Sequence, residues 1–430
     1  MFDFTSYAGI VNFIFFIIFT VFSLMMIHFI FFSIVGLFTY KKYPKAKVQH
    51  KYGLIIPARN EEKVVGNLIK SIQKNKYPQD KLQIFLIAHN CTDRTAEIGR
   101  ELGATVYEYN NPNECTMGYA FRYLFKQIEK DYGTQNYDGF FLFNADNILS
   151  TNYFEKMNDA FDSCNGEYVI TSFRNSKNFG SNVISGMYGL YFMIGCRLES
   201  RGRTVLNCST RVQGTGYVIN SKLVKDGWPY VTLTEDWEFS ADQIILNNKI
   251  KYCDEAVFYD EQPYKLKVAI RQRVRWSKGH LQSTAKNSPK LLKNMFKREI
   301  YFPTTYDMFW INFPFYVEAG IRKLATITLQ IILALQASTL LGTIGAILLG
   351  YVTGYIVNIF GNLPEQLFAF AIYRNRLGKM PVGKTIFHII MFPMFSIIGK
   401  WTTYYALFKK VDWKPIPHDK VVDVSKLEAK

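Results

Sequence analysis

Two long apolar stretches flank a region of mixed character. No residue between Phe4 and Tyr40 is charged, and between Leu324 and Tyr373 the single charged residue is Glu365. Both stretches are too long for buried helices of a soluble domain, so they predict transmembrane helices. The sequence between them alternates short β-rich runs with segments of helical periodicity, which indicates a mostly parallel α/β sheet.

The N-terminal apolar run extends from Val11 to Phe38 and predicts one transmembrane helix within residues 1–48. Asp3 precedes the run and several lysines, beginning with Lys41, follow it. The positive-inside rule therefore places the N-terminus outside and Lys41 in the cytosol. A cleaved signal peptide is the alternative, but the run is too long and lacks a basic start.

Residues 49–262 are predicted to form a cytosolic α/β domain. Asn60 is the expected N-cap of its first helix, since acidic residues follow it. Thr92 and Asp93 are expected to open the next helix, which ends at Gly103. The expected strands are Tyr52 to Ile56, Leu82 to Ala88, Thr105 to Tyr109, Phe140 to Phe143 and Tyr168 to Phe173.

Residues 263–304 are predicted to form interfacial amphipathic helices. Apolar residues repeat at helical spacing from Leu266 to Val274, and basic residues occupy the other faces. A second basic, amphipathic patch runs from Leu291 to Arg298. This part of the chain is therefore expected to lie on the membrane surface.

Residues 305–410 are predicted to carry three or four transmembrane passes, and residues 411–430 form a basic cytosolic tail. The candidate segments are Tyr306 to Val317, Ala325 to Phe360 as two passes hinged near Gly342, and Thr385 to Phe408. The expected protein is a multi-pass protein of the plasma membrane whose α/β domain faces the cytosol.

The net charge of +16 raises the question of nucleic-acid binding. The basic residues gather beside apolar segments, where anionic lipid headgroups and membrane topology account for them. The expected partner is therefore the lipid bilayer and not nucleic acid. All six cysteines lie in the predicted cytosolic domain without metal-ligand spacing, so we expect free thiols.

Polar residues follow the first two predicted strands. Pro57, Arg59 and Glu61 follow the first strand, and Asp93 follows the second. Because ligands of open α/β sheets bind at the carboxyl ends of strands, this group is predicted to bind a nucleotide, with Asp93 accepting from a uracil imide. The alternative is a pair of ordinary helix N-caps.

The fourth predicted strand runs directly into Asn144, Ala145 and Asp146. Carboxylate oxygens suit a hard divalent cation that bridges the diphosphate oxygens of a bound nucleotide. We predict that Asp146 binds a divalent cation and that Asn144 and Ala145 line the nucleotide. A capping aspartate after a strand is the alternative.

The acidic triplet Thr234-Glu235-Asp236 precedes a helical segment and follows the turn Gln213-Gly214-Thr215-Gly216. A carboxylate within reach of an acceptor hydroxyl can act as a general base, and Asp236 is the candidate, with Glu235 and Thr234 beside it. The two glycines of the turn, which flank Thr215, let the backbone approach a bulky ligand. An ordinary acidic helix start is the alternative.

Three residues of the predicted interfacial helix complete the candidate site: Gln272, Arg275 and Trp276. Arg275 can pair with a departing diphosphate, and Gln272 and Trp276 can hold an acceptor sugar by hydrogen bonding and stacking. An arginine beside a tryptophan is also an ordinary feature of membrane-surface helices.

In this order the motifs resemble those of the processive family 2 glycosyltransferases, which include cellulose, hyaluronan, chitin and poly-N-acetylglucosamine synthases and bacterial β-glucan synthases. The resemblance covers about Tyr52 to Gly279 and extends to the flanking apolar helices. The motifs are Asn90-Cys91-Thr92-Asp93, Asn144-Ala145-Asp146, Gln213-Gly214-Thr215-Gly216, Thr234-Glu235-Asp236, and Gln272-x-x-Arg275-Trp276.

The resemblance implies a Rossmann-like GT-A domain, a UDP-sugar donor, Mg²⁺ or Mn²⁺, and inverting β-transfer to a growing polysaccharide. It implies that Asp93 contacts the nucleotide, Asp146 the metal, and that Asp236 is the base. The glycine-rich turn and the Gln-x-x-Arg-Trp residues would line the acceptor and the diphosphate. The membrane helices would form a channel for the polymer.

Two features depart from that family. Asn144 stands where the first Asp of Asp-x-Asp is usual, so the metal site has one charge fewer. A Phe-x-Val-Thr-x-Lys gating motif and the regulatory C-terminal domain of bacterial cellulose synthases are not expected. The leading hypothesis is a processive enzyme that polymerises UDP-glucose into a β-glucan and moves it across the plasma membrane. Alternatives are a UDP-N-acetylglucosamine donor and transfer of a single sugar to a lipid carrier.

Overall fold

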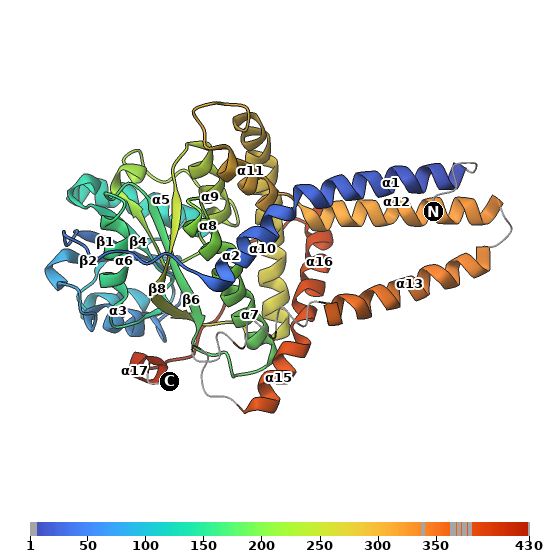
Figure 1. The fold of residues 1–430 in the computed structure, drawn as a ribbon. Helices are drawn as coiled ribbons and strands as arrows, with labels where there is room; N and C mark the ends of the chain where they lie inside the picture. The colour runs from blue at the N-terminus through green and yellow to red at the C-terminus, as the bar shows by residue number, and fades with distance from the viewer. Residues whose placement is uncertain are drawn as a thin grey trace.

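The computed structural model describes residues 7–336, 340–361, 367, 371, 376 and 381–428. Its centre is an eight-stranded sheet with the strand order β3-β2-β1-β4-β7-β6-β8-β5. Strands β1 to β4 run parallel, as do β6 and β8, whereas β5 and β7 are antiparallel to their neighbours. The prediction of a mostly parallel α/β sheet is confirmed (Figure 1).

Five of the strands coincide with the predicted ones to within a few residues, and β5, β7 and β8 were not predicted. The strands are β1 (Tyr52–Ala58), β2 (Leu82–His89), β3 (Thr105–Tyr109), β4 (Gly139–Leu142), β5 (Ile148–Leu149), β6 (Val169–Ser176), β7 (Tyr217–Asn220) and β8 (Ile250–Asp260). The helices of this domain are α3 (Val65–Gln73), α4 (Thr95–Glu101), α5 (Met117–Tyr132), α6 (Tyr153–Asp162), α7 (Val183–Ile194), α8 (Gly202–Val205) and α9 (Glu235–Ile245). Short helical turns are η1 (Gln79–Lys81), η2 (Thr134–Asn136) and η4 (Ser221–Val224), and η3 (Gly195–Arg201) is a π-helix.

Alternate residues of β1 face two helical layers. Leu54 and Ile56 pack with α3 and α6 in one buried cluster, whereas Ile55 packs with α5 and α9 in the other. This is the period-2 alternation of a strand that is covered on both faces. The packing fixes the carboxyl ends of β1 and β4, which lead directly into Arg59 and Asp146.

The start of the first helix differs from the prediction, which is wrong for Asn60. Asn60 has a φ of 58°, in the left-handed region, and α3 begins only at Val65. The Asn60 side chain instead accepts a hydrogen bond from the Thr92 amide at 2.8 Å, so it joins the loops after β1 and β2. The next helix, α4, begins at Thr95 and is followed by Gly103, close to the prediction.

The predicted interfacial region contains one long helix, α10 (Leu266–Asn294). The predicted second basic patch, Leu291 to Arg298, therefore begins within α10, because Pro289 lies inside the helix and does not end it. A proline removes one backbone donor, but α10 packs against α9, α16 and α11 (Phe302–Ile311) along its length, and this packing keeps it continuous.

The remaining helices are α1 (Tyr7–Met25), α2 (Ile27–Phe38), α12 (Phe315–Gln336), α13 (Leu340–Gly361), α15 (Val382–Met391), α16 (Pro393–Phe408) and α17 (Val424–Glu428). Helices α1, α12 and α13 project from one side of the α/β domain, with α10 and α16 at their base (Figure 1). Among the described residues, Phe13–Phe38 and Val382–Phe408 are long and apolar enough to cross a membrane. The predicted hinge residue Gly342 lies in the first turn of α13, and the predicted number of passes stays a prediction.

Candidate active site

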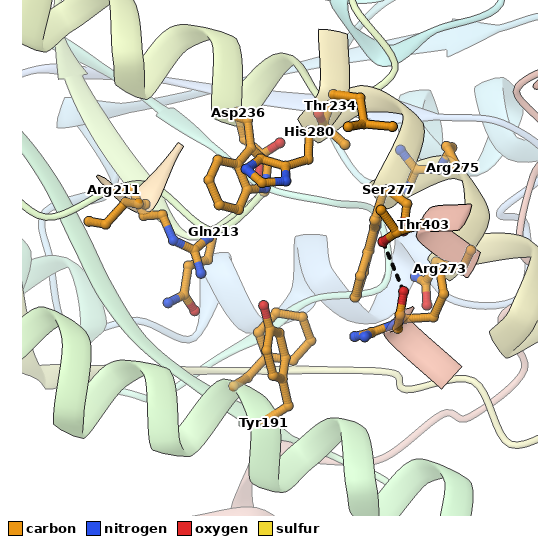
Figure 2. A pocket seen from close by; sticks show the side chains of 18 of the residues that line it. Tyr191, Arg211, Gln213, Thr234, Asp236, Arg273, Arg275, Ser277, His280 and Thr403 are labelled. Carbon is orange, nitrogen blue, oxygen red and sulfur yellow. Dashed lines mark hydrogen bonds between the residues drawn. The ribbon is translucent and has the colours of Figure 1, made fainter. Parts of the chain in front are cut away.

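Two adjoining cavities lie at the carboxyl end of the sheet. The inner chamber, of about 430 Å³, is enclosed by residues of α7, α9, α10 and α16 (Figure 2). The strand-end cavity, of about 120 Å³, lies where β1, β4 and β8 end. The two cavities meet at five residues that line both of them, namely Met117, Asn144, Arg174, Gln272 and Arg275.

The predicted catalytic residues Thr234, Glu235 and Asp236 all lie in the wall of the inner chamber. Thr234 is the N-cap residue of α9, which begins at Glu235. The partial positive charge of a helix N-terminus stabilises carboxylates in its first turn. The backbone of Gly214 passes close to this turn, since a Cβ there would lie 3.8 Å from Asp236 Oδ2.

Close packing of α10 against the start of α9 brings the predicted Gln-x-x-Arg-Trp motif into the same chamber. Gly279 permits this approach, because a Cβ at this position would lie 2.3 Å from Thr234 Oγ1. Arg275 Nη1 donates a hydrogen bond to the Leu233 carbonyl at 2.8 Å. The motif residues that line the chamber are Gln272, Arg275 and Trp276.

The two carboxyl groups at the start of α9 have perturbed pKa values. Burial and the neighbouring Asp236 raise the pKa of Glu235 to about 8. Burial also raises the pKa of Asp236, but Arg211, the Trp237 backbone amide and Arg275 oppose this effect. Glu235 therefore holds a proton at neutral pH, whereas Arg211, the Trp237 amide and Arg275 favour the ionised form of Asp236, which is the form that a general base requires.

Two buried arginines that the sequence patterns did not reveal lie near Asp236. Arg174 Nε donates to Asp260 Oδ2 at 2.7 Å. Arg211 forms an ion pair with Glu199 of the π-helix at 3.2 Å. Arg174 lies in β6 and Arg211 in the loop before β7, and neither stands in a recognisable motif. Only the folded chain brings them together.

The strand-end cavity is lined by six predicted nucleotide- or metal-binding residues: Pro57, Arg59, Glu61, Asn144, Ala145 and Asp146. Asp146 Oδ2 accepts a hydrogen bond from the Glu261 amide at 2.7 Å, which fixes the carboxylate. Within the described residues, no group of three or more His, Cys, Asp or Glu side chains is arranged to hold a metal ion. The donor set fits a cation that is held by one carboxylate together with the phosphate oxygens of a ligand, which is the usual mode for Mg²⁺.

The candidate nucleotide contact Asp93 does not line either cavity. Its Oδ2 accepts from the Glu62 amide at 3.1 Å, and its Oδ1 accepts from the Thr95 amide at 3.1 Å. These bonds hold the turn before α4 against the turn after β1. Its predicted contact with the nucleotide base stays a prediction.

Thr215 and Gly216 of the glycine-rich turn also lie outside the two cavities. Thr215 Oγ1 accepts a hydrogen bond from the Asn144 amide at 2.8 Å, so it supports the loop that follows β4. Gly216 lies against the ring of Phe258, where a Cβ would be only 2.1 Å from a ring carbon. Both residues thus support the walls of the site without lining either cavity.

Residues 411–428, which we call the C-terminal strap, cross the strand-end cavity. His418 Nδ1 lies 2.8 Å from Glu61 Oε1, and the Arg59 guanidinium lies 4.9 Å from the centre of the Trp413 ring. The strap residues that line the cavity are Trp413, Lys414, Pro415, Ile416 and His418. The strap then ends in α17, where Val424 packs in an apolar cluster.

His418 of the strap is protonated at neutral pH. Burial lowers the pKa of His418, but the carboxylates of Asp146 and Glu61 outweigh this effect and raise it to about 9.

Comparison with known proteins identifies the family. Residues 50–279 match the family model described as "Glycosyltransferase like family 2", and the match covers more than half of the chain. The chain belongs to this family. This family 2 glycosyltransferase has the predicted GT-A, Rossmann-like α/β fold, and its assignment as an enzyme is confirmed. The family match does not distinguish the processive branch, which stays a prediction.

Individual relatives are more distant. The probable glycosyltransferase YdaM of Bacillus subtilis (strain 168) is 23% identical over 369 residues, which cover 84% of this glycosyltransferase and 83% of YdaM. The 4,4'-diaponeurosporenoate glycosyltransferase of Staphylococcus haemolyticus is 24% identical over 258 residues, covering 47% of this chain and 64% of that protein.

Solved structures show similarity at low identity. The mannosyltransferase PcManGT from Pyrobaculum calidifontis, in complex with GDP-Man and Mn²⁺, is 12% identical, with a TM-score of 0.47, and the match covers 77% of this glycosyltransferase and 95% of that chain. S. aureus TarS 1-349 in complex with UDP-GlcNAc is 14% identical, with a TM-score of 0.41, and the match covers 81% and 92%.

Proposed function

We propose that this enzyme is associated with the membrane and transfers a sugar, with inversion, from a UDP-sugar to an acceptor hydroxyl. The observation that carries the proposal is the junction of the two cavities. The strand-end cavity takes the nucleotide diphosphate, and the inner chamber takes the acceptor. The cavities share Arg275 and Arg174, and the carboxylate of Asp236 lies in the chamber wall beside this junction.

The proposed reaction is a single displacement. Asp236 accepts the proton of the acceptor hydroxyl while the oxygen of that hydroxyl forms a bond to the anomeric carbon of the donor sugar. The bond between that carbon and the diphosphate oxygen breaks, and the electron pair leaves with UDP. Arg275 stabilises the charge that develops on the diphosphate, and Trp276 supplies an aromatic face for a sugar ring.

The site fits a divalent cation, Mg²⁺ or Mn²⁺, held by Asp146 together with the donor diphosphate. Such a cation neutralises charge on the leaving diphosphate. The other side chains of the strand-end cavity have separate roles in the proposal. Pro57, Arg59 and Glu61 bind the nucleotide portion, and Asn144 lies between the nucleotide and the acceptor.

UDP-glucose is the donor that we propose first, with UDP-N-acetylglucosamine as the alternative. Transfer of one sugar to a membrane acceptor agrees best with the relatives, one of which is named for 4,4'-diaponeurosporenoate and not for a polysaccharide. Processive synthesis of a β-glucan and its export across the plasma membrane is the second candidate. The presence of Gln272, Arg275 and Trp276 in a chamber that extends to α12 and α16 favours it.

Membrane vesicles that contain the protein, supplied with radiolabelled UDP-glucose or UDP-N-acetylglucosamine, test the proposal. We expect label from one donor in the organic-solvent extract, together with release of UDP. Label in an insoluble polymer would instead establish the second candidate. No transfer and no UDP release with either donor would contradict the proposed function.

A further inference from the structure

The inner chamber is amphipathic. Its polar side is formed by the start of α9, where Asp236 lies. Its aromatic wall is formed by α16, the residue before it and the chain around the start of α12, which contribute Phe313, Phe315, Phe392 and Phe395. A ligand that fills the chamber therefore meets both hydrogen-bonding groups and aromatic rings.

The apolar wall continues into a surface suited to a bilayer. Helix α12 begins at Phe315, in this wall, and carries side chains such as Ile321 and Leu324, which are 66% and 68% exposed. Figure 1 shows α12 beside α1, both projecting away from the α/β domain. Exposed apolar surface of this extent belongs in lipid, so a ligand that arrives along this wall carries an apolar part.

The chamber wall is also strongly cationic. It carries Arg174, Arg211, Arg273 and Arg275 but only two carboxyl groups. Arg174 and Arg211 each pair with a carboxylate that lies outside the chamber. In the part of the chain that the structure describes, no carboxylate forms a salt bridge with Arg273 or Arg275. An anionic ligand in the chamber can therefore form a salt bridge with either guanidinium group.

The two unpaired arginines occupy different places. Arg275 lines both cavities and so faces the donor diphosphate, whereas Arg273 lines the inner chamber alone. Arg273 is only 9% exposed, and its Nη2 donates to the Phe395 carbonyl at 3.3 Å. Gly399 leaves space for this group, because a Cβ there would lie 2.2 Å from Arg273 Nη2. Figure 2 shows Arg273 and Arg211 on opposite sides of the chamber.

Two other titratable groups of the chamber are neutral at neutral pH, and among the described residues Asp236 forms no salt bridge with Arg273. Glu235 is protonated at neutral pH, since its pKa is raised to about 8. Burial, together with Arg211, lowers the pKa of His280 to about 4, so its ring is neutral. The Arg273 guanidinium lies 3.8 Å from the centre of the Phe395 ring, a cation–π contact that offsets part of the cost of burying the charge. An anionic ligand at Arg273 would offset more of this cost.

We propose that the acceptor is an anionic amphiphile, a membrane lipid in which a phosphate or phosphodiester group lies close to the free hydroxyl. The inference rests on the proposed function, because it names the acceptor of the same transfer. The hydroxyl lies at Asp236, the phosphate binds Arg273, and the acyl chains follow the aromatic wall toward α12 and α16. Transfer joins the sugar to the lipid oxygen, and the hydroxyl proton passes to Asp236.

The test compares two lipids that share their acyl chains and differ in the anion. The full-length protein is reconstituted in phosphatidylcholine vesicles that contain either dioleoylphosphatidylglycerol or dioleoylglycerol. Both lipids carry a free hydroxyl, but only the first carries a phosphodiester. Phosphatidic acid is added to the dioleoylglycerol vesicles so that the surface charge is equal. Labelled UDP-glucose and UDP-N-acetylglucosamine are supplied in turn, and the lipids are separated by thin-layer chromatography.

We expect phosphatidylglycerol to be labelled at least about tenfold faster than dioleoylglycerol, the factor that one charge-assisted hydrogen bond supplies. Arg273→Gln should lower this ratio by about the same factor, and Arg273→Lys should restore part of it. Lys267→Gln removes a charge from an exposed position of the same helix and should leave the ratio unchanged.

Equal labelling of the two lipids by the wild-type protein would overturn the inference, even if the arginine variants fail to fold. Labelling of dioleoylglycerol that depends on phosphatidic acid would also overturn it, because the anion would then belong to a neighbouring lipid. In both cases the transfer itself continues and the proposed function stands. If neither donor releases UDP with any lipid, the proposed function fails instead.

Discussion

Replacement of Glu235 by glutamine tests the electrostatics of the site through the stability of the protein. Glu235 is buried beside Asp236, and its pKa is raised from 4.5 to about 8. Glutamine has the same shape as the neutral acid but cannot ionise. The variant therefore has a neutral side chain at every pH. In the wild-type protein, position 235 is neutral only while Glu235 holds a proton.

The sign of the effect follows from the direction of the shift. A carboxyl group whose pKa is raised by folding contributes its full stability below the unfolded value of 4.5, and this contribution is lost as the pH rises to about 8. Each pKa unit corresponds to about 1.4 kcal/mol, so the cost reaches at most about 5 kcal/mol near pH 8. Glu235→Gln should therefore match the wild type near pH 4.5 and exceed its stability increasingly toward pH 8.

Thermal unfolding of the two purified proteins, followed by intrinsic fluorescence across this pH range, measures the difference. Glu167→Gln, at an exposed surface position, is the control and should give a difference that does not change with pH. A flat difference for Glu235→Gln, or a variant that is less stable than the wild type at pH 8, would mean that folding does not raise the pKa of Glu235. Glu235 would then be ionised at neutral pH.

Three further predictions concern packing, the strap and the metal. Gly279→Ala places a methyl group 2.3 Å from Thr234 Oγ1, so it should lower stability by about 1–3 kcal/mol and reduce kcat. Gly345→Ala, whose Cβ meets nothing within 4 Å, should do neither. Deletion of residues 411–430 should raise the KM for the UDP-sugar about tenfold, since it removes an aromatic and a charged contact. A lower KM would instead mean that the strap blocks the donor. A chelator should abolish transfer, and Asp146→Asn should raise the Mg²⁺ concentration needed for half-maximal rate, which a titration of initial rates measures.

Much of the α/β sheet could be predicted because its strands carry their signal locally. The strands β1, β2, β3, β4 and β6 are short apolar runs, and all seven residues of β1 are buried. Helix α10 was harder to predict, since Pro289 normally indicates a break and only packing against other helices keeps it continuous. Asn60 shows the same limit, because its left-handed conformation depends on a bond to the loop that follows β2.

The parts of the candidate site that belong to short sequence motifs could be predicted. This holds for the residues around Asp236 and for Arg275, which the structure brings to one chamber. Arg211 and Arg273 had no such signal, because their surroundings depend on segments far away in the sequence. The C-terminal strap has no hydrophobic periodicity between Phe408 and Val424, so its position over the strand-end cavity could not be derived from the chain alone.

Replacement of Asp236 by asparagine tests whether Asp236 is the base that activates the acceptor hydroxyl. Asparagine preserves the size of the side chain but cannot accept the proton, so the transfer rate in labelled vesicles should fall by about 10²–10⁴. UDP binding should persist, because the strand-end cavity is unchanged. Asp226→Asn, on the exposed loop before Gly227, should leave the rate intact. An Asp236→Asn enzyme that transfers sugar at nearly the wild-type rate would show that Asp236 is not the base.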